Sequence, residues 1–319
     1  MGSLFEEMTE AHRAIRPQVS VTPLEHSPLL SAELGCELYF KCEHHQPSGS
    51  FKIRGATNKI RSLDAEAQRR GVFTASTGNH GLAVARAAKL AGIPATVYVA
   101  ANAAPSKVAG IRALGAKLMV VDGASFDAEL AGRQQAEAEG AVYISPYNDR
   151  EVVVGQGTLG IELMEQDHAL DAIFIATGAG GLMGGTGTAV KAINPAVQMI
   201  GVWPEASPVM LRALEAGRLV AVEEFPTLSD GTTGAIEPDS ITFPLCQQVI
   251  DDRITVGEDE IATAMRRIAE TEHWIVEGAA GAAFAGLIQQ AHAWRGKRVA
   301  VVLCGRNIGH DTFRDAVAG

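Results

Sequence analysis

Short runs of β-branched residues alternate with alanine-rich stretches from Gly71 onward, and this alternation constrains the fold more than any other feature. The runs have the length of strands, and the stretches between them have the apolar spacing of helices. Strands that alternate with helices form a parallel sheet covered by those helices. In chain order the first unit comprises VFTAS, NHGLAVARAAKLAG, ATVYVA, PSKVAGIRALGA, KLMVV, FDAELAGRQQAEAEG and AVYIS. The sequence therefore predicts a compact α/β unit over residues 71–145.

A second series of helices and strands follows SPYNDREVV. Residues 223–244 interrupt it and are predicted to form an irregular surface segment. In chain order the second series comprises the helix GQGTLGIELMEQ, the strand AIFIAT, a glycine-rich turn, the helix TAVKAI, the strand QMIGVW, the helix PVMLRALEAG, helices over 259–294 and the strand RVAVVLC. We expect a small α/β domain inserted into a larger one, with a small-molecule site in the cleft between them.

Charge and composition exclude several classes of partner. The net charge of −10 over 319 residues disfavours nucleic acid, whose phosphates require clustered Lys and Arg. No apolar run approaches the roughly 20 residues of a membrane span, and the N-terminus lacks the pattern of a secretion signal. Four cysteines, without metal-type pairing, are too few for a disulfide scaffold: Cys36, Cys42, Cys246 and Cys304. We therefore expect a cytoplasmic protein that binds a small molecule, without a nucleic-acid or membrane partner.

The glycine cluster TGAGGLMGGTG, Thr177 to Gly187, lies between a predicted strand and a predicted helix. Glycines let backbone N–H groups approach an anion, and a helix N-terminus adds partial positive charge, so a phosphate is expected here. The cluster lacks the Gly-Lys-Ser/Thr of a P-loop and has Met183 where a dinucleotide fingerprint needs a third glycine. Glu205, after the next strand, keeps a nucleotide-binding oxidoreductase open as an alternative. Tight packing alone is a second alternative.

The segment ASTGNHG, Ala75 to Gly81, also ends a strand and opens a helix. Ser76, Thr77 and free N–H groups suit a carboxylate, and Asn79 can donate to a phenolate or carbonyl oxygen. Taken alone, the segment is better explained as an ordinary helix N-cap beside His80.

Lys52 and Cys304 are the remaining candidates for chemistry. A lysine in a partly desolvated cleft has a lowered pKa, and its neutral amine can form a Schiff base and later act as a base. A thiol is a weak donor and acceptor that can meet a ring nitrogen without imposing a charge. The common alternatives are a solvated lysine and a buried core cysteine.

In this order and at these separations, PSGSFKIRGA, STGNHG, TGAGGL and CGRN resemble the serine/threonine dehydratase and serine racemase family of fold-type II pyridoxal-phosphate enzymes. The resemblance implies an α/β protein similar to the tryptophan synthase β chain, with two open, twisted, mostly parallel sheets flanked by helices. It also implies that the pyridoxal 5′-phosphate cofactor lies in the interdomain cleft. The expected domains are a large one of residues 1–65 and 146–319 and a small mobile one of residues 66–145.

The resemblance assigns a role to each candidate residue. Lys52 would hold the cofactor as a Schiff base, with Phe51 near the cofactor ring. Cys304 would face the pyridine nitrogen, and Glu277 in VEGAAGAA resembles the glutamate behind that nitrogen. The residues implied for the 3′-oxygen and phosphate are Asn79, Gly178, Ala179, Gly180, Gly181 and Leu182, and those for the substrate carboxylate are Ser76, Thr77, Asn79 and His80.

Two departures from the family pattern refine the predicted activity. Thr77 stands where racemases of this group carry a serine base, and its extra methyl restricts its rotamers. Trp203 and Val209 stand at two positions that hold metal-binding acids in related enzymes, so no divalent cation is predicted there. The sequence favours a lyase that converts a β-hydroxy amino acid to a 2-oxo acid and ammonia. A racemase is the main alternative; an oxidoreductase or a non-catalytic binding module is more remote.

The predicted substrate is a serine- or threonine-type amino acid or a specialised one, such as a hydroxyaspartate, a phenylserine or a hydroxyectoine-related compound. Arg54, Arg150 and Arg306 are candidates for binding a second carboxylate, although a solvated or structural role is expected for each. The family implies a homodimer or homotetramer. No regulatory domain is expected after CGRN, because few residues follow it.

Overall fold

The computed structural model describes residues 2–101, 103, 105–123 and 125–318. The α-helices are α1 Gly2–Ile15, α2 Pro28–Leu34, α3 Lys52–Arg61, α4 Ala65–Arg70, α5 Asn79–Ala91, α6 Pro105–Ala113, α7 Ser125–Glu139, α8 Arg150–Gln166, α9 Gly181–Ile193, α10 Val209–Ala216, α11 Thr242–Val249, α12 Glu258–Thr271, α13 Gly278–Gln290 and α14 His310–Val317. Short 3-10 helices are η1 Glu43–His45, η2 Asp230–Thr232 and η3 Ala291–Trp294. The strands are β1 Leu24–His26, β2 Glu37–Lys41, β3 Val72–Ala75, β4 Ala95–Ala100, β5 Lys117–Val121, β6 Val142–Tyr143, β7 Ala172–Ala176, β8 Gln198–Pro204, β9 Asp252–Val256 and β10 Arg298–Val302.

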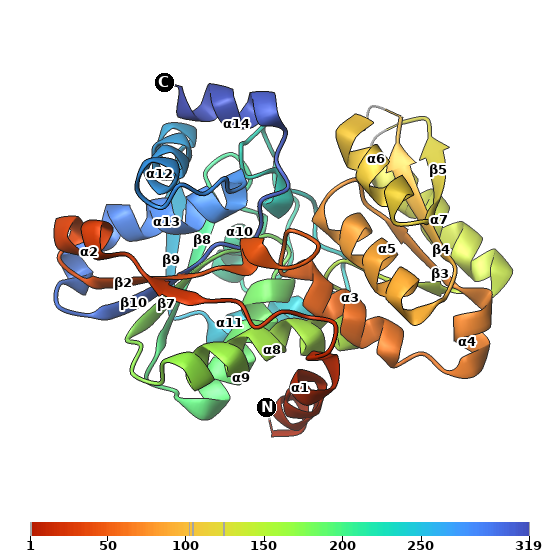
Figure 1. The fold of residues 1–319 in the computed structure, drawn as a ribbon, viewed down its shortest axis with the longest axis horizontal. Helices are drawn as coiled ribbons and strands as arrows, with labels where there is room; N and C mark the ends of the chain where they lie inside the picture. The colour runs from red at the N-terminus through yellow and green to blue at the C-terminus, as the bar shows by residue number, and fades with distance from the viewer. Residues whose placement is uncertain (1, 102, 104, 124, 319) are drawn as a thin grey trace.

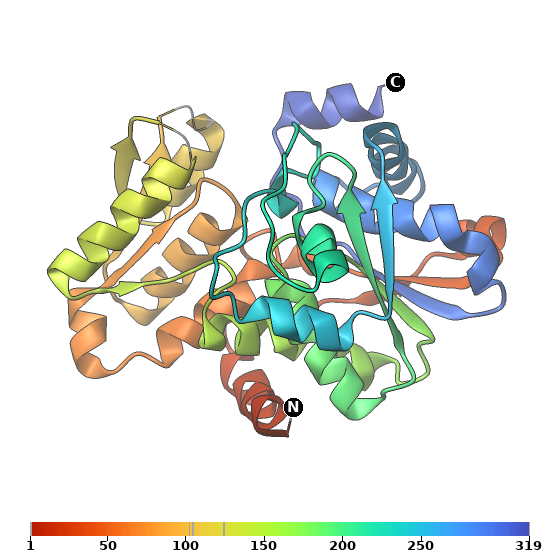
Figure 2. The same cartoon turned by 180° about the vertical axis from the view of Figure 1, so that it is seen from behind.

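The strands form two separate sheets, which lie in two units side by side (Figure 1 and, from behind, Figure 2). The smaller sheet has the order β5-β4-β3-β6 and is parallel throughout. The larger has the order β1-β2-β10-β7-β8-β9 and is parallel except for β1, which runs antiparallel to β2. The predicted pair of open, mostly parallel sheets flanked by helices is therefore confirmed.

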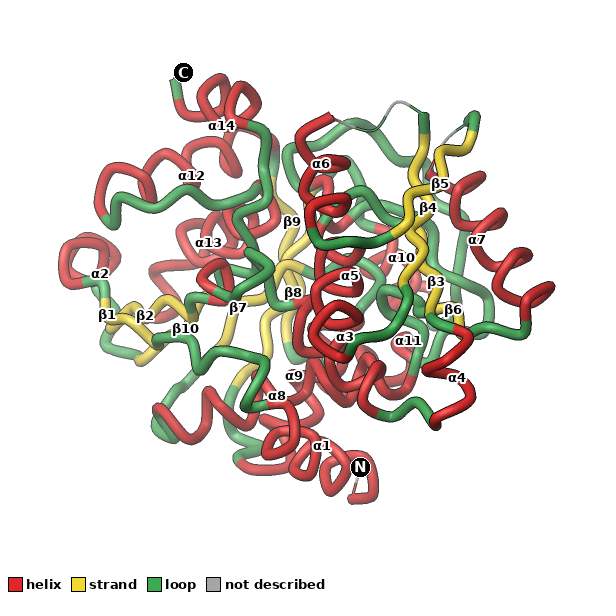
Figure 3. The backbone as a smooth tube through the Cα atoms, turned by 45° about the vertical axis from the view of Figure 1, so that its right-hand side comes forward, coloured by secondary structure: helices red, strands yellow, loops and turns green. Residues whose placement is uncertain are grey.

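The centre of the larger sheet is apolar on both faces. All five residues of β7 are buried, as are four of the five residues of β10. Continuous burial of this kind is typical of parallel strands covered by helices on both sides. Helix α13 packs against β7, β8 and β10, while α8 and α9 pack against each other on the opposite face (Figure 3). Because helices cover both faces of the sheet, a ligand site is expected at the strand ends and not on a face.

Helix α3 lies between the two units and packs against both α5 and α8. Ile53, Ala56 and Ile60 lie on one face of α3 at helical spacing and are buried. They share an apolar cluster with Val84 and Ala88 of α5. The domain boundary expected after residue 65 therefore assigns to the large domain a helix that is also part of the core of the small unit.

Helix α9 begins at Gly181, seven residues before the predicted helix TAVKAI, so the expected glycine-rich turn is largely the first half of a helix. Glycine disfavours helix in isolation, which is why the pattern misplaced this boundary. Here tertiary packing decides the conformation: a Cβ at Gly185 would lie 2.6 Å from the carbonyl oxygen of Val153, and one at Gly187 would lie 2.6 Å from Val249 Cγ2. Close helix packing therefore explains the last glycines of the cluster.

Other elements lack a clear signal in the sequence. Strand β9 and helices α1 and α11 were not anticipated, and α11 begins inside the segment expected to be irregular. In the described part of the chain, no helix combines the length and apolar character that crossing a membrane requires.

Candidate active site

The Ser/Gly turn before Lys52 is joined to the segment after β10 by backbone hydrogen bonds. The Phe51 N–H donates to the Cys304 carbonyl at 3.0 Å, and the Arg306 N–H donates to the Gly49 carbonyl at 2.9 Å. Ser50 and Gly305 form an antiparallel bridge between these contacts. Two sequence motifs separated by more than two hundred residues therefore meet where α3 begins.

Lys52 is the first residue of α3, and its amine has one hydrogen-bond partner among the described residues. Nζ donates to the Pro146 carbonyl at 2.9 Å and lies 5.1 Å from the centre of the Phe51 ring. Burial lowers the pKa of Lys52 to about 8, although Cys304 and Glu277 act in the opposite direction. An appreciable minority of this amine is therefore neutral near physiological pH, far more than for an ordinary lysine, which suits a nucleophile or base.

The glycine loop after β7 reaches the same place. Gly180 has φ 87° and caps α9 without a side-chain hydrogen bond, so the first N–H groups of the helix have no side-chain cap. A Cβ at Gly181 would lie 3.1 Å from Tyr147 Cβ. Because Tyr147 follows the Pro146 that accepts from Lys52, the helix N-terminus and the amine converge on these two residues.

Glu277 is buried and bonds to two other candidate side chains, those of Asn79 and Cys304. Its two carboxylate oxygens accept from Asn79 Nδ2 at 2.8 and 2.9 Å, and Oε1 accepts from the Cys304 thiol at 3.6 Å. Asn307 donates its backbone N–H to Oε2 of Glu277 at 3.3 Å and its amide Nδ2 to Asn79 Oδ1 at 2.6 Å. This network connects α5 of the small unit to the carboxyl end of β10.

The Glu277 carboxyl and the Cys304 thiol both have raised pKa values, which favours the neutral form of each. Burial raises the pKa of Glu277, against the hydrogen bond from Asn79. Burial and the neighbouring Glu277 raise the pKa of Cys304 well above its usual value. Cys304 is therefore a neutral thiol, as the sequence predicted.

The loop between β3 and α5 presents Ser76 and Thr77, both partly buried. Ser76 Oγ accepts from the Gly78 N–H at 3.1 Å, and α5 has no side-chain cap at Gly78, so the ordinary N-cap interpretation does not hold. His80 is buried, and its Nε2 donates to the Ile144 carbonyl at 3.0 Å. Burial lowers the pKa of His80 to about 3, so its ring carries no positive charge toward a substrate carboxylate.

Comparison with known proteins identifies the family. Residues 15–305 match the family model described as "Pyridoxal-phosphate dependent enzyme". The chain belongs to this family. L-threonine ammonia-lyase of Thermotoga maritima is 41% identical over 305 residues, covering 95% of this chain and 75% of that protein. L-threo-3-hydroxyaspartate ammonia-lyase of Saccharomyces cerevisiae is 33% identical over 99% of this chain and 96% of its own length. The structure of maize serine racemase superposes with a TM-score of 0.92 at 33% identity, covering 98% of this chain and 96% of that one.

These similarities confirm the resemblance to the serine/threonine dehydratase and serine racemase group, and they argue against the oxidoreductase and the binding module. The described side chains fit pyridoxal phosphate. The uncapped N-terminus of α9 suits a phosphate, and the partly neutral Lys52 amine suits an aldehyde. The neutral Cys304 thiol suits a contact with an unprotonated pyridine nitrogen of the cofactor. The Asn79 amide donates to Glu277, and its predicted contact with the 3′-oxygen stays a prediction.

A cavity of about 450 Å³ lies between the two units of this pyridoxal-phosphate enzyme. Gly49 and Asn307 line it on the side of the large sheet, and Leu82 and Arg86 on the side of the small one. Its described lining does not include Lys52 itself, so it adjoins the candidate site through Gly49 and Asn307.

The three arginines considered for a second carboxylate differ in position. Arg54 is buried and ion-paired with Glu43 and Glu162, which makes it structural. Arg150 is exposed and pairs with Glu7. Arg306 lines the cavity between the units.

Sequence reasoning did not assign a role to Asn307, although the residue belongs to the quoted CGRN. Its amide contacts could not be read from the sequence, because its partner Asn79 is 228 positions away. The Pro146 carbonyl gives no sequence signal, since any residue offers one. At the positions compared with metal-binding acids, Trp203 and Val209 are buried and Glu205 is exposed. The absence of a divalent cation there stays a prediction.

Proposed function

We propose that this enzyme removes water and then ammonia from a β-hydroxy amino acid. The observation that carries the proposal is the neutral Cys304 thiol just after β10, which lies near enough to Lys52 to influence the pKa of its amine. A neutral partner leaves the cofactor nitrogen largely unprotonated, which favours loss of a β-leaving group. When bound, pyridoxal phosphate supplies an electron sink for the electron pair left on Cα.

Holding the cofactor, removing the Cα proton and binding the substrate carboxylate are each assigned to residues of this chain. Lys52 holds the cofactor and, once displaced by the substrate amine, removes the Cα proton with its neutral amine. Ser76, Thr77 and the uncapped first turn of α5 hold the substrate carboxylate. The substrate loses its β-hydroxyl as water, and the released enamine becomes an imine that takes up water to give a 2-oxo acid and ammonia.

The relatives support this class of substrate, because two of them are named as ammonia-lyases of L-threonine and L-threo-3-hydroxyaspartate. The proposed substrates are serine, threonine, hydroxyaspartate, phenylserine and hydroxyectoine-related compounds. Measuring 2-oxo acid release from each of them tests the proposal, with Lys52→Ala as the inactive control. Lack of turnover with the whole panel would contradict it.

Racemisation is the second candidate, supported by the superposition on maize serine racemase. Thr77, in the loop after β3, argues against it as the main activity. Chiral analysis of L-serine after incubation measures racemisation directly. Thr77→Ser should raise racemisation relative to 2-oxo acid release, whereas Ser76→Ala should not. Predominant racemisation by the unchanged enzyme would reverse the assignment.

The remaining roles belong to the same proposal. Asn79 and residues 178–182 bind the 3′-oxygen and phosphate of the cofactor, and the small unit moves as a domain. We also propose a cytoplasmic homodimer or homotetramer. Sedimentation velocity of the cofactor-loaded enzyme decides between these assemblies, and a monomer would contradict both.

A further inference from the structure

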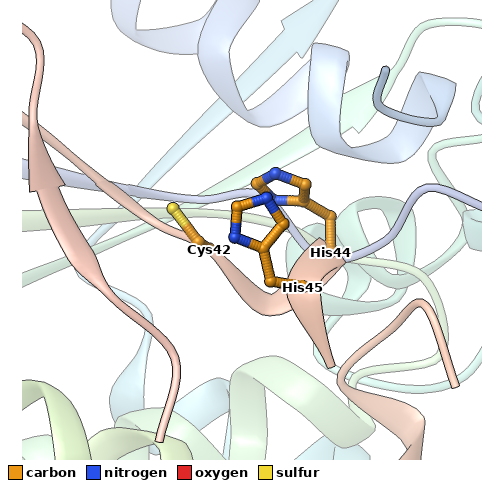
Figure 4. Close-up of side chains that lie close together, drawn as sticks. All are labelled: Cys42, His44 and His45. Carbon is orange, nitrogen blue, oxygen red and sulfur yellow. The ribbon is translucent and has the colours of Figure 1, made fainter. Parts of the chain in front are cut away.

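We propose that Cys42, His44 and His45 bind one Zn²⁺ ion at a site separate from the catalytic groups. Cys42 directly follows β2, and the two histidines belong to η1. One possible ligand atom from each residue lies within 4.8 Å of the other two, and Figure 4 shows the sulfur and both rings gathered at this turn.

The buried ring of His44 is independent evidence that this cluster binds a ligand. The side chain is 1% exposed, yet neither ring nitrogen has a hydrogen-bond partner among the described residues. Burying a polar group without a partner is costly, so such groups are rare in folded proteins.

The ligand types point to zinc. Zinc binding would release the Cys42 thiol proton to solvent, and the resulting thiolate and two imidazoles form a borderline-soft set that zinc binds tetrahedrally. Tetrahedral zinc with Zn–S and Zn–N bonds of ordinary length needs ligand atoms about 3.3–3.6 Å apart, so the cluster must contract by at most roughly 1.5 Å. His45 is exposed and can turn toward the ion, and its exposure gives the ion a path of entry. Three protein ligands leave the fourth position to water.

Ring packing is the competing explanation. The His44 and His45 rings lie 4.0 Å apart, and the Trp274 ring lies 5.0 Å from His44 and 5.5 Å from His45, measured between ring centres. The Cys42 thiol donates to the Phe40 carbonyl at 3.4 Å. Packing explains the proximity of the rings, but it leaves both nitrogens of His44 unbonded.

The location gives the ion a structural role. The His44 N–H donates to the Leu303 carbonyl at 2.8 Å, one residue before Cys304. Glu43, between two of the ligands, is ion-paired with Arg54 of α3. An ion at this turn would therefore restrain the backbone of the segment that connects β2 to Lys52.

The experiment uses the pyridoxal-phosphate-loaded enzyme after treatment with a chelator. Equilibrium dialysis against Zn²⁺ should show one ion per chain, and Co²⁺ should give a thiolate-to-metal absorption band. His45→Ala changes an exposed side chain, so the fold should be retained while the zinc affinity falls at least tenfold. Cys42→Ser should abolish the cobalt–thiolate band. Cys36→Ser, at another buried cysteine, and His292→Ala, at another exposed histidine, are the matched controls and should bind as the unchanged enzyme does.

Thermal unfolding gives a second measurement. Zinc should raise the melting temperature of the unchanged enzyme and of both controls by several degrees, but not that of His45→Ala. Equal zinc retention by the unchanged enzyme and a Cys42→Ser, His45→Ala double variant would overturn the proposal, because the zinc would then be bound elsewhere. Failure of the unchanged enzyme to retain zinc would overturn it as well.

Discussion

Lys41, which is buried, and Lys52, which is partly buried, differ in what their amines contact. Lys41 Nζ donates to Glu162 at 2.6 Å, to Gln166 at 2.8 Å and to the Thr22 carbonyl at 2.7 Å. Lys52 Nζ donates to a single carbonyl and makes no salt bridge among the described residues. Burial lowers the pKa of both. The difference shows that the partner, rather than burial, decides whether a lysine is a structural cation or a reactive amine.

The region around Lys41 is a network of compensated charges. Arg54 donates to Glu43 at 2.7 Å and to Glu162 at 2.9 Å, and all three side chains are buried. Although burial opposes it, the charges of Arg54 and Lys41 lower the pKa of Glu162 to about 2. Because Arg54 lies two residues after Lys52, the first turn of α3 carries a structural cation and a reactive amine together.

Among the substitutions that test the contrast between the two lysines, Lys52→Ala should have the largest effect on turnover. Turnover should fall by about 10³-fold or more, since a positioned base contributes roughly 10²–10⁴ and the cofactor loses its covalent link. Borohydride reduction followed by mass spectrometry should find no cofactor on the peptide that contains residue 52. Lys59→Ala, on the same helix, should keep both the activity and the label. A fully active Lys52→Ala enzyme would refute the assignment.

The next largest effect is expected from Arg54→Leu. Breaking a buried ion pair from one side leaves uncompensated charge, and here Glu43 loses its guanidinium, so the free energy of unfolding should fall by about 3–5 kcal/mol. Urea denaturation measures this change. A loss below about 1 kcal/mol would mean that the network does not stabilise the fold in the way described.

The pH dependence of cofactor capture separates the two lysines. The neutral Lys52 amine is the nucleophile, and it predominates only above its pKa of about 8. Below that pH, each unit should slow the reaction of cofactor-free enzyme with pyridoxal phosphate about tenfold. Above it, the rate should level off. Peptide mapping after reduction should find label at Lys52 and none at Lys41. A midpoint near the ordinary lysine value would show that Lys52 is not desolvated.

Arg150→Ala should have the smallest effect and serves as the exposed counterpart of Arg54. Arg150 pairs with Glu7 at 2.7 Å in an exposed position. Exposed pairs contribute little, so the free energy of unfolding should change by about 0.5 kcal/mol or less. Urea denaturation measures it beside Arg54→Leu, and equal losses in the two variants would remove the distinction between buried and exposed pairs.

The sequence predicted the order of helices and strands between β3 and β6 well, because short β-branched runs alternate there with alanine-rich stretches. Asn79 and Cys304, which the sequence assigns to one site with Lys52, both contact Glu277, and their shared role with Lys52 stays a prediction. The sequence could not predict the buried charges of Glu43, Arg54 and Glu162, since charged residues are usually exposed and the contact between Arg54 and Glu162 spans 108 positions. It misplaced the start of α9, because the glycines there serve contacts with α8 and α11 that a local pattern does not contain.

The position of β10 has a consequence for how the protein is made. This strand occurs late in the chain, yet it lies between β2 and β7 near the middle of the larger sheet. Until residues 298–302 leave the ribosome, β2 and β7 each present an unpaired, apolar edge, and Phe51 lacks the carbonyl that fixes it beside Lys52. The nascent chain therefore exposes apolar strand edges until residues 298–302 have emerged, and the same strand that completes the sheet also brings the Cys304 carbonyl to Phe51.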